Sequence, residues 1–114
     1  MMNNNTMIVK NWFELTAEYD SRKSFYGKAK VAYVYDNYGL CGMVLKSYDT
    51  IVLYKSAYGT IYKLWDGYSA TTMRHVNEFI NQYHGGNGGG KAWWNKLPVM
   101  DDFKYIEDFG FQLS

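Results

Sequence analysis

A run of glycines followed by a lysine is the pattern in this chain closest to a known chemical motif. Residues 85–91, GGNGGGK, match the spacing of two glycines and a lysine that cradles phosphate in nucleotide-binding loops. Ala92, however, stands where such a loop needs a magnesium-binding Ser or Thr. A phosphate loop also leaves a strand and opens a helix, whereas this run follows an expected helix. We therefore expect residues 85–91 to be a loop that ends a helix, not a nucleotide site.

Two further constellations contain residue types that act in catalysis or metal binding. His75 and Glu78 lie three residues apart on the expected helix, but His84 is nine residues further on and no third ligand stands at a recognisable spacing. A ligand pocket at this pair is the least favoured hypothesis.

Cys41 is the only cysteine and lies among apolar residues of an expected strand, so a buried free thiol is expected. The chain also lacks a serine elbow, a paired-carboxylate motif and a dinucleotide fingerprint. We expect no enzyme activity, no cofactor and no metal.

Basic residues next to aromatic residues form the pattern that points to binding. They occupy two places, the segment 20–29 and the first turn of the expected helix, and comprise Arg22, Lys23, Phe25, Tyr26, Lys28, Arg74 and His75. A cation at a helix N-terminus opposes the helix dipole, so Arg74 is expected to pair with Asp66, Glu78 or an anion of a partner. Basic residues among aromatic ones bind single-stranded nucleic acid by stacking and phosphate contact. The same residues also suit an internal polar network, and the sequence leaves both interpretations open.

The composition limits the class of protein. The chain has 114 residues, a formal net charge of +1 and 20% charged residues, which fits a single globular domain over 1–114. A strongly basic nucleic-acid binder or an acidic DNA mimic is disfavoured. Aromatic residues reach 19%, with 12 Tyr, so many tyrosines must be partly exposed. No secretion signal and no apolar run of the ~20 residues needed to span a membrane is present, and we expect a cytoplasmic protein.

The elements that position these residues follow from apolar periodicity. Alternation with a period of two predicts strands over 29–36, 40–48, 50–57 and 60–65, joined by short turns. Because parallel neighbours need long crossovers, the four strands are expected to form an antiparallel meander. A helix over 68–83 is predicted by hydroxyl residues that can cap it and by an apolar stripe at three- and four-residue spacing, made of Met73, Val76, Phe79, Ile80 and Tyr83.

The ends of the chain complete the expected fold. The spacing of apolar residues over 7–19 favours a short helix, although 7–9 also suits a strand. Residues 91–97 are expected to form a short helical turn over the core, and 103–113 a final strand or an extended tail. The prediction is therefore an α+β fold: a four-stranded antiparallel meander with a main amphipathic helix on one face, a short N-terminal helix and a C-terminal strand or tail.

Four segments together resemble a family of small uncharacterised proteins of phages and mobile elements in gut and Gram-positive bacteria. They cover most of the chain and read DSRKSFYGKA at 20–29, LKSYDTIV at 45–52, GYSATTMRHVNEFI at 67–80, and GGGKAWWNKLPV after that. The resemblance does not imply a particular activity for this chain. The resemblance implies a context, a short accessory protein made inside a bacterial cell.

Two functional hypotheses follow. The first is a non-enzymatic protein that binds a host protein, such as a CRISPR effector or another defence protein, and inhibits it. Its partner-binding residues are expected to be Arg22, Lys23, Phe25, Tyr26, Arg74 and His75. The second is a nucleic-acid-binding accessory protein that uses the basic and aromatic residues of the loop 20–28 and of the start of the main helix.

Overall fold

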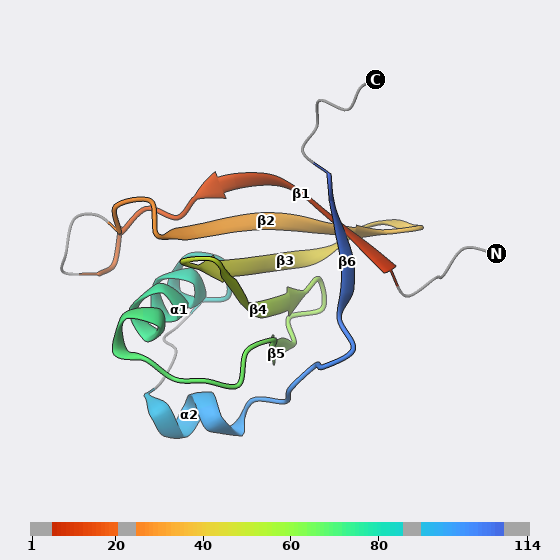
Figure 1. The fold of residues 1–114 in the computed structure, drawn as a ribbon. Helices are drawn as coiled ribbons and strands as arrows, with labels where there is room; N and C mark the ends of the chain where they lie inside the picture. The colour runs from red at the N-terminus through yellow and green to blue at the C-terminus, as the bar shows by residue number, and fades with distance from the viewer. Residues whose placement is uncertain (1–5, 21–24, 86–89, 109–114) are drawn as a thin grey trace.

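The computed structural model describes residues 6–20, 25–85 and 90–108, and within them six strands form one curled sheet (Figure 1). The order across the sheet is β5-β4-β3-β2-β1-β6. Neighbours from β1 to β5 are antiparallel, and β6 is parallel to β1. The strands and helices in chain order are β1 (Thr6–Glu14), β2 (Ala29–Asp36), β3 (Gly39–Ser47), β4 (Thr50–Ser56), β5 (Ile61–Lys63), α1 (Ala70–Tyr83), α2 (Lys91–Lys96) and β6 (Lys104–Asp108).

The prediction of a four-stranded, purely antiparallel sheet with an N-terminal helix is wrong. Strands β2 to β5 lie within three residues of the predicted bounds, but two more strands, β1 and β6, extend the sheet, and β6 makes it mixed. The parallel contact joins segments from the two ends of the described chain, so no short turn in the sequence indicates that β1 and β6 are neighbours. Residues 109–113, predicted to continue the last strand or tail, lie outside the described residues.

A bulge explains why β1 looked helical. The pairing with β2 shifts between Lys10 and Phe13, where Asn11 has a positive φ of 66°. The extra residue changes the strand's alternation, so Val9 and Trp12 lie on one face and Phe13 on the other. A period of two broken in this way resembles the three- and four-residue spacing of a helix.

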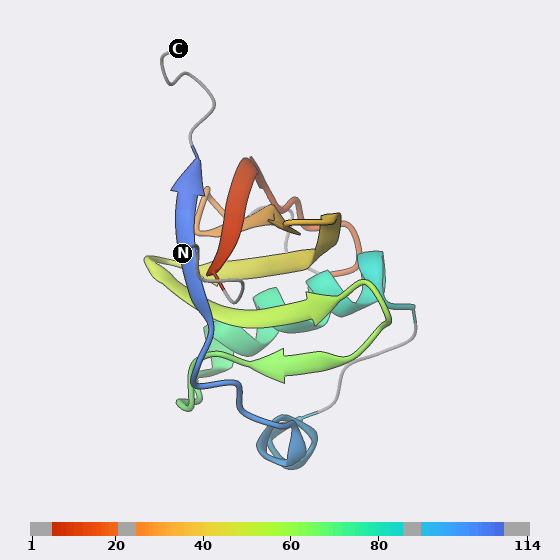
Figure 2. The ribbon, with the colours of Figure 1, turned by 90° about the vertical axis from the view of Figure 1, so that its right-hand side faces the viewer.

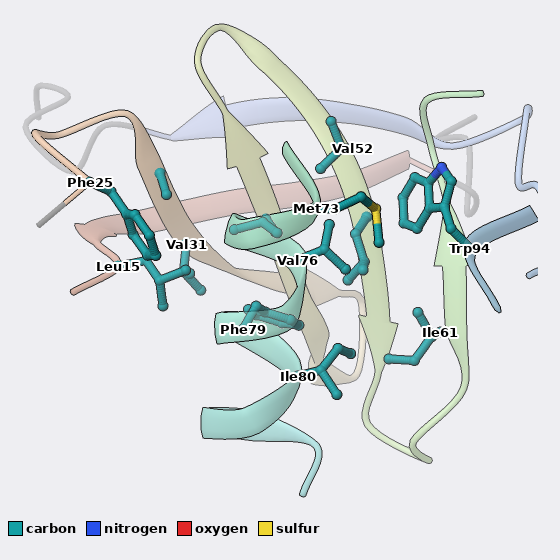
Figure 3. Packing of buried hydrophobic residues seen from close by; sticks show 13 residues of the cluster. Leu15, Phe25, Val31, Val52, Ile61, Met73, Val76, Phe79, Ile80 and Trp94 are labelled. Carbon is teal, nitrogen blue, oxygen red and sulfur yellow. The ribbon is translucent and has the colours of Figure 1, made fainter. Parts of the chain in front are cut away.

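The main core lies between the sheet and the two helices (Figures 2 and 3). Helix α1 begins after Ser69, whose hydroxyl accepts a hydrogen bond from the Thr72 amide at 3.0 Å, and Gly85 follows its end with a φ of 79°. Trp94 of α2 is fully buried, and its indole N–H donates to the Gly67 carbonyl at 2.8 Å. The helical turn expected over 91–97 is thus present and closes the core. Its buried members from the helices are Met73, Val76, Phe79, Ile80 and Trp94.

A second, smaller core covers the opposite face of the sheet. It is built from buried side chains of the central strands with the segment before β6 packed against them, and comprises Val9, Ala32, Val34, Val44 and Tyr54 with Met100 and Phe103 beside them. The indole of Trp12 donates to the Glu107 carboxylate at 3.0 Å and so ties β1 to β6. Both faces of the curled sheet are therefore packed.

Candidate functional site

One end of the sheet brings together four of the six residues expected to bind a partner. The connection from β1 to β2, the turn from β3 to β4 and the start of α1 all lie at this end, which is to the left in Figure 1. Between them is a hollow of about 240 Å³, which we call the aromatic hollow. Its lining consists of Phe25, Tyr26, Lys28, Tyr48, Thr71, Arg74 and His75. Arg22 and Lys23 lie outside the described residues.

Arg74 is fixed by an ion pair across the hollow's edge. Its guanidinium donates from Nε and Nη2 to the two carboxylate oxygens of Asp20, both at 3.0 Å, and lies 5.2 Å from the centre of the Phe25 ring. A bidentate pair of this kind holds the arginine in one orientation. The intramolecular partner of Arg74 is therefore Asp20, and the prediction of Asp66 or Glu78 is wrong. The pair explains a cation in the first turns of α1.

Glu78 is a buried anchor for the segment before the hollow. Its carboxylate accepts hydrogen bonds from the backbone amides of Glu18, Tyr19 and Asp20 at 2.8–3.1 Å and from the Gln82 amide. These donors satisfy the buried charge and bind residues 18–20 to the middle of α1. No group of three metal-binding side chains exists in the described part of the chain, and nothing in this arrangement pairs Glu78 with His75 for chemistry.

His75 belongs to an internal polar network and also forms a wall of the hollow. Only 1% of its surface is exposed; Nδ1 is 2.8 Å from the Ser47 hydroxyl, which is itself 3.0 Å from the Thr72 hydroxyl. The Phe25 ring meets the imidazole edge to face at 4.7 Å. Burial, helped by the charge of Arg74, lowers the pKa of His75 to about 4. The imidazole is therefore neutral at pH 7, and the structure shows the internal polar network that the sequence left open as one of two interpretations.

Cys41 lies at the other end of β3 and takes no part in this site. Its thiol is half-buried, 3.8 Å from the Met7 sulfur, and burial raises the pKa of the thiol above its ordinary value. A thiol of this kind is a weak nucleophile at neutral pH. The thiol is free, as expected, but it is half-buried and not buried as predicted.

A second hollow adjoins the first and was not anticipated. This lysine hollow, of about 230 Å³, shares Lys28 and Tyr48 with the aromatic hollow, and its full lining is Gly27, Lys28, Lys30, Lys46, Tyr48 and Asp49. Lys30 and Lys46 are direct partners across β2 and β3. Alternation along one strand predicts that each lysine faces away from the main core, but only the register between strands shows that they face each other.

Tyr48 is the aromatic residue of this site that sequence reasoning missed. It stands in the two-residue turn between β3 and β4 with a φ of 56°, and its amide donates to the Lys28 carbonyl at 2.7 Å. The signal was present in the sequence, because a hairpin turn in a meander lies at the same end as the connection from β1 to β2. Half of the Tyr48 surface is exposed, so its ring is available above both hollows.

Comparison with known proteins places this arrangement in a family. Residues 13–96 match the model of DUF8033, a family of unknown function. The chain belongs to this family. The part shared with DUF8033 contains both hollows, α1 and α2, whereas β6 and most of β1 lie outside it. No curated protein and no solved structure matches the chain significantly. None of the described helices is long and apolar enough to cross a membrane.

Proposed function

We propose that this chain is a non-enzymatic binding protein that contacts a partner protein through the end of the sheet that carries the aromatic hollow. The observation that carries the proposal is the gathering of exposed tyrosines and an oriented arginine around one hollow. Tyr26 is 83% exposed and Tyr48 50% exposed, beside Arg74. Tyrosine and arginine are the residue types over-represented at the centres of protein interfaces.

The rigidity of this end supports the same function. Glu78 holds the segment 18–20 through three backbone amides, and Arg74 holds Asp20 through two hydrogen bonds. Side chains that are ordered before binding lose less conformational entropy when a partner arrives. A surface prepared in this way suits stoichiometric binding and needs no catalytic group.

The target we propose is a protein of a bacterial defence system, such as a CRISPR effector, in the cytoplasm of the host cell. The support is the resemblance to small proteins of phages and mobile elements, together with the small size of the chain. An inhibitor of this kind acts by covering a surface of its target, which agrees with the aromatic and cationic character of the hollow.

A phage-plating assay tests this proposal. The chain is expressed in a panel of bacterial strains, each immune to a phage through one defence system, and plaques are counted. We expect the native chain to restore plaques against at least one system, and Tyr26→Ala/Tyr48→Ala to lose most of that effect. The matched control is Tyr38→Ala/Tyr58→Ala, because both tyrosines are 97% exposed in the turns at the opposite end of the sheet. Unchanged plating with every system, or equal loss in the control, contradicts the proposal.

Nucleic-acid binding is the second candidate, and the lysines favour it. Lys28, Lys30 and Lys46 line one hollow next to the exposed rings of Tyr26 and Tyr48. If these residues neutralise phosphates, affinity for a single-stranded 20-mer falls steeply with salt, and Arg22→Ala/Lys23→Ala or Lys30→Gln/Lys46→Gln reduces the slope of log affinity against log salt by about one per lost contact. Absence of binding at low salt removes this candidate.

A further inference from the structure

Three hollows adjoin one another around the end of the sheet through shared lining residues, and we call them together the groove. The aromatic hollow shares Lys28 and Tyr48 with the lysine hollow, and the lysine hollow shares Asp49 with a third hollow of about 440 Å³. We call this third one the apolar hollow because Ile51, Leu64, Met100 and Phe103 supply half of its lining, with Asp49, Thr50, Asp101 and Tyr105 around them. A ligand that follows the groove is therefore extended and polymeric.

The centre of the groove carries an excess of positive charge, because three lysines and one aspartate line it. Lys30 and Lys46 face each other across β2 and β3, an arrangement that destabilises a sheet when both residues carry the same charge. Within the described residues, none of the three lysines of this hollow forms a salt bridge. The ammonium of Lys28 lies 5.7 Å from the Tyr48 ring centre and that of Lys46 lies 5.0 Å from the Trp12 ring centre. An anion seated between the lysines relieves their repulsion.

Two carboxylates offset part of this positive charge. Glu14 is the cross-strand partner of Lys30 on β1, and its carboxylate also accepts a hydrogen bond from the Gly27 amide at 3.0 Å. Asp49 lines the lysine hollow on the side of the apolar hollow, where Asp101 adds a second negative charge. Positive charge is thus confined to the middle of the groove, and negative charge begins where the apolar hollow opens.

This distribution of charge selects the class of ligand. Single-stranded nucleic acid carries a phosphate at every nucleotide, so a strand that continues from the lysines into the apolar hollow brings phosphates towards Asp49 and Asp101. A peptide can instead place carboxylates over the lysines and a large apolar side chain beside Leu64 and Phe103. The complementary ligand is therefore mixed, acidic in one part and apolar in the next.

We infer that the groove binds an extended segment of the partner protein in which acidic residues are followed by large apolar ones. The carboxylates lie against Lys28, Lys30 and Lys46, and the apolar side chains enter the hollow lined by Leu64 and Phe103. This inference rests on the proposed function, because it names the chemistry of the partner segment that the binding surface recognises.

Binding of three fluorescent probes of equal length tests the inference. The probes are a ten-residue peptide with five glutamates followed by five leucines and phenylalanines, a peptide with lysines in place of the glutamates, and a ten-nucleotide oligothymidylate. We expect the acidic peptide to bind with the highest affinity. Lys30→Gln/Lys46→Gln should lower that affinity about tenfold, because it removes two charge contacts that are exposed or only half-buried. Lys55→Gln/Lys96→Gln changes the net charge equally, outside the three hollows, and should leave affinity within about twofold. Leu64→Asp should also weaken binding.

Other results of these binding measurements would overturn the acidic-segment inference. Tighter binding of the oligothymidylate, abolished by Lys30→Gln/Lys46→Gln, overturns the peptide assignment in favour of nucleic acid. An equal effect of the control pair means that only net charge matters and also overturns it. The same lysine variant, tested in the phage-plating assay, separates the two proposals. If it restores plaques as well as the native chain while Tyr26→Ala/Tyr48→Ala does not, the binding function stands and the acidic segment is wrong.

Discussion

The neutral, buried His75 makes the stability of this protein depend on pH in a defined window. Its pKa is about 4 in the folded chain and about 6.5 when the chain is unfolded. The unfolded state therefore binds more protons below pH 6.5. The contribution of His75 to stability is fully present above that pH and is lost as the pH falls towards 4. The difference of roughly 2.5 pKa units corresponds to a loss of about 3 kcal/mol in the free energy of unfolding.

Urea unfolding of His75→Asn and of the native chain between pH 7.5 and 4.5 measures this contribution. Asparagine places a polar atom near the position of Nδ1, within reach of Ser47, and does not titrate. We expect the native chain to lose about 1 kcal/mol more than the variant by pH 5.5 and about 2–3 kcal/mol more by pH 4.5. The control is His84→Asn, since His84 is the exposed C-cap of α1 and lies outside the network. Parallel stability curves for the native chain and His75→Asn refute a histidine held neutral by burial.

Three further substitutions test other parts of the structure by urea unfolding at pH 7.5. Glu78→Gln should cost about 2–3 kcal/mol, because an amide NH₂ then faces backbone donors, and a loss below about 0.5 kcal/mol contradicts that anchor. Gly42→Ala should cost about 1–3 kcal/mol, because its Cβ would lie 2.4 Å from the Lys55 carbonyl oxygen on the neighbouring strand; an unchanged midpoint contradicts the close approach. Asn77→Ala should stabilise α1 by about 0.5–1 kcal/mol, because it removes a buried side-chain oxygen that has no hydrogen-bond partner among the described residues and improves helix propensity; destabilisation refutes this.

The parts of the fold that were predictable from sequence are those decided by neighbours in the chain. Strands β2 to β4 show enough alternation, and helix α1 a clear enough apolar stripe, to be located from sequence, and Ser69 marks the helix start. Strand β1 was mistaken for a helix because the bulge at Asn11 breaks its alternation. Strand β6 joins the sheet through a parallel contact with β1, and no local pattern encodes a partner as far along the chain as Lys104 is from Thr6.

The candidate site, like the fold, was predictable from sequence only in part. Phe25, Tyr26, Arg74 and His75 were recognised as polar or aromatic residues that the apolar stripe does not require, and the structure brings them to one hollow. The pairing of Lys30 with Lys46 depends on the register between two strands, which composition does not show. Glu78 is charged, and charged residues are seldom fully buried, yet four donors allow it to be buried in α1.

The interior contacts also change which residues should be altered to study function. Arg74 and His75 are among the partner-binding residues predicted from sequence, but Arg74 fixes Asp20 and His75 joins β3 to α1 through Ser47. Substitution of either residue perturbs folding and binding together. Tyr26 and Lys30 are exposed, so the core does not require their side chains. A loss of activity in variants of these two residues with unchanged stability therefore reports on binding alone.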